Sequence, residues 1–161
     1  MLIHQHVAGI DVVGSIFPIP NLRGEGVILY NATGSAIVKG EVVLMGYDDT
    51  SGREASAIVA ATMAYGVRTA IAMEAIADGA IGRFQISGLA EALVDDTGTL
   101  AAGRFLEVLN TGTYLVDDGT TTRNTTSVGV LKDAVTAAEG GGSAVLKTVM
   151  LIPEAHTIAA S

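Results

Sequence analysis

Between residues 24 and 152 the chain repeatedly begins a strand-like run and soon interrupts it. Five short runs are apolar or alternate polar and apolar side chains, and each stops at a cluster rich in Gly, Asp, Asn, Ser or Thr or at the chain's last proline. Alternation is the period of a half-buried strand, and these cluster residues favour turns. The runs are residues 26–30, 41–45, 83–87, 104–109 and 147–151. Short strands at nearly regular spacing predict a mainly all-β fold, either a small barrel or a sandwich.

Two segments carry a helical alternative. Residues 54–64 are rich in alanine, which favours helix. Residues 130–139 precede a Gly140-Gly-Gly break and place apolar side chains at helical spacing, namely Leu131, Ala134, Val135 and Ala138. The expected fold therefore contains at most one or two short helices.

The chain divides into three parts. Residues 1–23 are apolar and carry Pro18 and Pro20, which suit neither a helix nor a central strand, so they are expected to form an extended arm or an edge strand. Residues 24–152 form the β-rich core, and residues 153–161 form a short tail. Residues 31–45 resemble residues 95–109, which allows two related β units over residues 26–88 and 89–151.

Composition limits the function. Only 16% of the 161 residues are charged, against about 25% in an average domain, while 49% are hydrophobic. No apolar stretch reaches the roughly 20 residues of a membrane-spanning helix. A net charge of −8 without a basic cluster argues against nucleic-acid binding. A chain so poor in charge is expected to cover part of its surface by assembling with copies of itself or with a larger scaffold.

Asp96-Thr-Gly follows an apolar run, as the catalytic loop of an aspartic protease does. Such a protease needs two facing carboxylates, so one motif in each chain would serve only in a homodimer. Asp95 stands where that motif requires an apolar residue, and this weakens the protease hypothesis.

Repetition favours a structural interpretation of the same residues. Three strand ends carry an Asp pair followed by Gly, Thr or Ser, a combination that forms Asx-turns. The residues predicted to form turns are Asp48, Asp49, Asp95, Asp96, Gly98, Asp117, Asp118 and Gly119.

The metal-binding alternatives are weak. The Asp pairs lack the alternating oxygen ligands and closing Glu of a calcium loop. His4 and His6 have the spacing of two ligands on one strand face, but His156 is the only other histidine and the chain has no cysteine. We therefore expect no metal, no cofactor and no catalytic residues.

Residues 26–45, 65–108 and 144–151 resemble the small head decoration, or cement, proteins of tailed bacteriophages. The likeness lies in an Asn-x-Thr-Gly turn, a Lys-Gly or Ala-Gly pair that opens a strand, and the pattern Glu-Ala-Ile-Ala-x-Gly-x-x-Gly before an alternating strand. The resemblance covers about residues 26–151.

The resemblance implies a β-rich structural protein of the virion, made in the host cytoplasm. Its expected partners are the major capsid protein, bound on the outside of the shell, and copies of itself, because proteins of that family often form homotrimers. The resemblance also implies that there is no catalytic site. Another phage component, such as a tail, collar or fibre-base protein, is the alternative. The expected contact residues of the arm are Leu2, Ile3, Val7, Ile10, Val12, Val13, Ile16 and Phe17.

Overall fold

The computed structural model describes residues 13–19, 24–48, 52–57, 68–109, 111–123 and 126–152. Within these ranges the chain forms strands and no helix, which confirms the mainly all-β prediction. The strands are β1 (Ile16–Ile19), β2 (Gly24–Asn31), β3 (Val42–Asp48), β4 (Gly52–Ser56), β5 (Thr69–Ala72), β6 (Ile81–Gln85), β7 (Gly88–Asp95), β8 (Phe105–Val108), β9 (Leu115–Asp117), β10 (Gly129–Leu131) and β11 (Ala144–Leu151).

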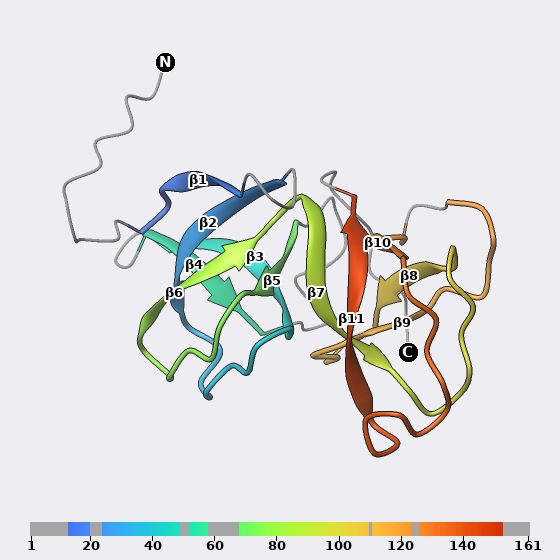
Figure 1. Cartoon of the computed structure of the whole chain (residues 1–161). Coiled ribbons are helices and arrows are strands. Elements are labelled where there is room, and N and C mark those ends of the chain that lie inside the picture. The colour runs from blue at the N-terminus through green and yellow to red at the C-terminus, as the bar shows by residue number, and fades with distance from the viewer. Residues whose placement is uncertain are drawn as a thin grey trace.

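The first barrel consists of β2, β4, β3, β5 and β6, in that order around the wall. It closes because β2 pairs with β4 on one side and with β6 on the other. β1 is not needed for this closure: it pairs antiparallel with the first half of β2, on the side where β4 pairs with Tyr30 and Asn31. Figure 1 shows this barrel in blue to green.

The second barrel consists of β7, β9, β8, β10 and β11, and it repeats the topology of the first. In each barrel the first strand runs parallel to the third, and all other neighbours are antiparallel. Only Ile86 and Ser87 separate β6 from β7, so the barrels lie next to each other (Figure 1). The two related β units that the sequence allowed are thus two barrels.

The repeat extends to individual residues. An isolated bridge joins Ile37 to Ile76 in the first barrel, and Leu100 to Val135 in the second. The Gly40 N–H donates to Ala72, and the Gly103 N–H donates in the same way to Leu131. These matching pairs fix which positions of β3 and β5 correspond to which positions of β8 and β10.

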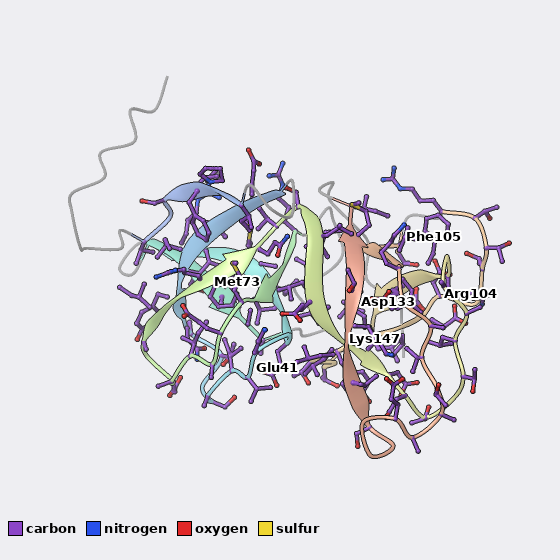
Figure 2. All side chains as sticks on the ribbon, in the orientation of Figure 1. Glu41, Met73, Arg104, Phe105, Asp133 and Lys147 are labelled. Carbon is purple, nitrogen blue, oxygen red and sulfur yellow. The ribbon has the colours of Figure 1, made fainter. Side chains whose placement is uncertain are left out.

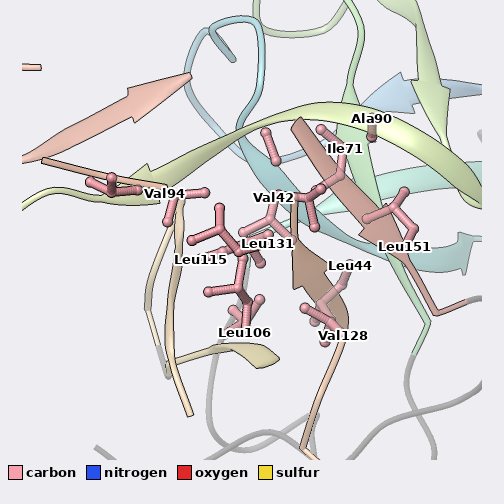
Figure 3. Close-up of a cluster of buried hydrophobic side chains, with 14 residues drawn as sticks. Val42, Leu44, Ile71, Ala90, Val94, Leu106, Leu115, Val128, Leu131 and Leu151 are labelled. Atoms are coloured by element: carbon pink, nitrogen blue, oxygen red, sulfur yellow. The ribbon is translucent and has the colours of Figure 1, made fainter. Parts of the chain in front are cut away.

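Each barrel has its own buried core, but the second core includes side chains from the first barrel. β3 alternates, so that Val43 faces the interior of the first barrel while Val42 and Leu44 face outward. Those two side chains and Ile71 of β5 belong to the core cluster of the second barrel (Figure 3). One apolar cluster therefore fills the second barrel and the contact between the barrels.

Gly40 allows the two barrels to approach closely. Its φ of 87° is readily adopted only by glycine, and its carbonyl accepts a hydrogen bond of 2.8 Å from Leu93 N–H of β7. A Cβ at this position would collide with the Leu146 side chain. Two residues later, at the start of β3, the Val42 N–H donates to the carbonyl of Thr113 in the second barrel over 3.0 Å.

The helical alternative at residues 130–139 is wrong. Residues 129–131 are strand β10, and Val135 is buried in its bridge to Leu100. Of the residues at helical spacing, Leu131 and Val135 enter the barrel, whereas Ala134 and Ala138 are exposed, because tertiary packing outweighs the weak helix preference of alanine. In the other segment, residues 54–56 belong to β4, and residues 58–64 lie outside the described part of the chain.

Candidate interaction surfaces

β1 is the described end of the predicted arm. Ile16 is 40% exposed, Phe17 and Val13 are half-buried, and the other predicted contact residues lie outside the described residues. The Phe17 ring covers Gly26 directly, at the place where a side chain on β2 would stand. These undescribed arm residues are Leu2, Ile3, Val7, Ile10 and Val12.

The outer edge of β1 is poor in hydrogen-bond donors. The Ile28 N–H donates to Ser15, so by antiparallel alternation Phe17 and Ile19 direct their backbone groups toward β2. Ile16 and Pro18 then direct theirs outward, and proline has no N–H. Pro18 therefore limits strand addition at this edge, which favours contacts made through side chains.

Several of the predicted turn residues hold turns. Asp95 accepts hydrogen bonds from the Thr97 N–H and hydroxyl, and Asp118 accepts them from the Thr120 N–H and hydroxyl. The Asp117 carboxylate accepts from the Gly119 N–H, where φ is 77°.

The other predicted turn residues differ in their placement. Gly98 is exposed beside the Asp95 turn, and Asp48 ends β3. The Asp48 side chain and all of Asp49 lie outside the described residues.

Asp96 is fully buried rather than presented in a cleft. Its Oδ2 accepts hydrogen bonds from the N–H groups of Gly140 and Gly142, and its main-chain carbonyl accepts one from Ala138. The carboxylate thus holds the connection between β10 and β11. Nothing in the sequence around Asp96 signals burial, because the groups that bind it lie more than forty residues away.

Asn31 has the matching role in the first barrel. It is also fully buried, and its Nδ2 donates to the carbonyls of Ser35, Ile76 and Ala77, two of which lie between β5 and β6. Its main-chain carbonyl accepts from Gly79. The Asn-x-Thr-Gly pattern at residues 31–34 predicts a turn at Asn31 and carries no signal for its burial.

Two ion pairs perturb pKa values in the second barrel. The Asp117 carboxylate binds Arg104 through two oxygens, at 3.0 Å and 2.6 Å, and this hydrogen bonding raises the pKa of Arg104. Figure 2 labels Arg104 and Lys147, the basic residues of the two pairs. The pKa of Glu139 is lowered, first by its hydrogen bond with Lys147 and next by that with the Thr136 N–H. Both pairs join neighbouring segments of the barrel, which is a structural role.

The part of the chain that the structure describes holds no group of His, Asp and Glu side chains able to bind a metal. All three histidines, His4, His6 and His156, lie outside it. No helix in the described residues is long and apolar enough to span a membrane.

A small open pocket lies at one end of the first barrel. Its volume is about 100 Å³. It is lined by Glu25, Met45, Arg68, Thr69, Ile86, Ser87 and Ile152. No sequence motif signalled this pocket, because its walls come from five separate segments that meet only in the closed barrel.

The chain is similar to known proteins at the level of solved structures. No protein-family model and no curated protein matches the chain. Among solved structures, the crystal structure of the head fiber gp8.5 N base of bacteriophage phi29 is similar, with a TM-score of 0.47 and 12% sequence identity. The match covers 81% of this chain and 95% of that one.

Proposed function

We propose that this chain is a structural protein of a bacteriophage particle and that it binds the outer surface of the assembled capsid. Its partners would be the major capsid protein and copies of itself, the latter as a homotrimer. The role needs no cofactor and no catalysis, and the buried Asp96 serves the fold in this proposal.

The observation that carries the proposal is the position of β1. The first barrel closes through the pairing of β2 with β4 and with β6, and β1 covers the part of β2 that β4 leaves unpaired, so contacts made by the chain before β1 need not open the wall. The sequence leading into β1 is apolar, and Ile16 exposes a large apolar side chain on it. An apolar segment attached to a closed barrel suits contact with a neighbouring protein.

Binding of this kind stabilises the shell by linkage. A protein that binds only the assembled shell lowers the free energy of that state and leaves the disassembled subunits unaffected. Many identical copies add their contributions, so each contact can be weak. Blunted strand edges would help, because the copies then do not polymerise through their sheets.

The experiment compares two truncations with the full chain on purified capsids. Removing residues 1–12 keeps β1, whereas removing residues 1–20 also takes Phe17 from Gly26 and exposes one side of β2. On that side of β2, β4 pairs only with Tyr30 and Asn31, so no other described strand pairs with the residues that β1 covers. We expect the shorter truncation to keep the thermal stability of the barrels and to lose capsid binding.

Occupancy is measured by cosedimentation with shells and by microscopy of particles. Unchanged occupancy after either truncation contradicts the role of the arm. No binding of the full chain to shells contradicts capsid decoration altogether. Labelling at the tail, the collar or a fibre base would replace decoration by that alternative structural role.

A further inference from the structure

The contact between the barrels joins an outer face to an open end. The outer face of β3 and β5, made of Val42, Leu44 and Ile71, packs against the end of the second barrel. Ala90, Val128 and Leu151 line that end, and all six side chains belong to one cluster (Figure 3). The first barrel therefore closes the end of the second barrel with an apolar face.

The second barrel has the same outer face. Val42 pairs with Ile71 across β3 and β5, and Phe105 pairs with Val130 at the corresponding positions of β8 and β10. Val42 and Ile71 are each only 2% exposed, whereas Phe105 and Val130 are half-buried. The face that is covered in the first barrel is thus partly open in the second.

The first barrel has the same end. Thr69 lies two residues before Ile71, as Val128 lies two before Val130. Phe84 of β6 and Val149 of β11 are the corresponding buried core residues of the two barrels. Ile86 follows Phe84 by two residues, as Leu151 follows Val149. Thr69 and Ile86 line the open pocket, so the end that is filled in the second barrel is hollow in the first.

We propose that a second copy of this chain supplies the missing contact, head to tail. The Phe105 and Val130 face of one copy would cover the open end of the first barrel of the next, repeating the contact made within each chain. Such an interface is heterologous, so it produces a closed ring if the rotation closes and an open chain if it does not.

Charge supports this choice of partner. Glu107 occupies the position of Leu44, the residue that packs with Val128 within the chain. In the contact between copies, Glu107 would therefore meet Thr69 and the adjacent Arg68, which lines the pocket. Glu25 also lines the pocket, but Arg68 directly precedes Thr69, the residue in the place of Val128, so the acidic Glu107 faces a basic side chain there.

The test measures molar mass by light scattering after gel filtration, from micromolar to millimolar protein. The full chain should form concentration-dependent oligomers. Val130→Glu places a charge on the proposed face, and Thr69→Tyr fills the proposed pocket, so each variant alone should be monomeric. Mixed, they should form a dimer of twice the chain mass and nothing larger, because one good face and one good pocket remain.

Three controls make the outcome decisive. Ile81→Glu adds the same charge at an exposed apolar position away from both surfaces and should not change the mass. Circular dichroism melts establish that each variant is folded. A charge reversal tests the same contact where Val130→Glu or Thr69→Tyr does not fold. Glu107→Arg should weaken association, and adding Arg68→Glu to the same chain should restore it.

A full chain that is still monomeric at millimolar concentration overturns the inference. That result is expected if the chain's own residues fill the pocket. Self-association that survives Thr69→Tyr also overturns it, since a symmetric contact through the Phe105 face would be the cause. The inference does not rest on capsid binding. An arm truncation that abolishes capsid binding without changing the number of copies in the oligomer separates the two.

Discussion

The two barrels share a topology but differ in how they meet solvent and one another. The outer face of β3 and β5 is buried by the neighbouring barrel, while the corresponding face of β8 and β10 is partly exposed. The residues follow this difference, since Leu44 in the first barrel corresponds to Glu107 in the second. A repeated framework thus fixes the positions, and the surroundings of each barrel decide which side chains are tolerated there.

The same comparison holds for the buried polar residues. Asn31 donates hydrogen bonds to carbonyls of the connection between β5 and β6. Asp96 accepts hydrogen bonds from amides of the equivalent connection between β10 and β11. One framework is therefore tied by side chains of opposite polarity. Each side chain suits only the backbone groups that its own connection presents.

The largest difference is expected from a matched pair of truncations. Ile71→Ala should reduce the free energy of unfolding by about 2–5 kcal/mol, because it leaves a cavity between the barrels. Val130→Ala, at the equivalent half-buried position, should cost less than about 1 kcal/mol at dilutions where the protein is monomeric. Urea denaturation measures both. Equal losses would mean that the two faces are equally covered.

The isosteric exchange of the buried polar residues comes next. Asn31→Asp removes the donor to three carbonyls, and leaving one buried polar group unpaired costs about 1–3 kcal/mol. Asp96→Asn keeps an oxygen for the Gly140 and Gly142 amides and should cost less. Denaturant midpoints of the two variants decide this order. A larger loss for Asp96→Asn would show that its negative charge is the stabilising feature.

The strands could be predicted because their signals are local. Alternation and turn chemistry indicated the runs at residues 26–30, 83–87 and 104–109, and each coincides with part of a strand. The parallel pairing of β2 with β4 and the closure of each barrel depend on contacts distant in sequence, which one chain's pattern does not encode.

The candidate sites were harder to predict for the same reason. Asp95 and Asp96 are adjacent and look alike in the sequence. Asp95 holds an exposed turn, whereas Asp96 is buried under a glycine connection that lies beside it in the barrel but more than forty residues away in the sequence. Side-chain burial is a property of the closed barrel, so no local motif could distinguish the two.

Two glycines test how closely the barrels approach each other. Gly40 and Gly103 both have positive φ, at 87° and 89°, so alanine should cost about 1–2 kcal/mol of backbone strain at either site. A Cβ at Gly103 meets open space, while one at Gly40 meets Leu146 and lies 3.0 Å from the Leu93 nitrogen. Gly40→Ala should therefore cost about 1 kcal/mol more, measured by thermal melts. Equal costs would place the barrels farther apart than the structure does.

The smallest effect concerns an ion pair described only in the second barrel. Glu139 and Lys147 are joined by a hydrogen bond of 2.7 Å, and Ala80 holds the place of Glu139 in the first barrel. Because the pKa of Glu139 is lowered in the folded protein, the stabilisation is complete above the ordinary glutamate pKa of about 4.3 and is lost as the pH falls through the lowered value. Glu139→Gln should therefore lower the melting temperature slightly at neutral pH and have no effect in acid. Glutamine can still accept the hydrogen bond from the Thr136 N–H. A difference in melting temperature that persisted unchanged at low pH would therefore mean that this hydrogen bond is misaligned in the variant and that the ion pair is not the cause.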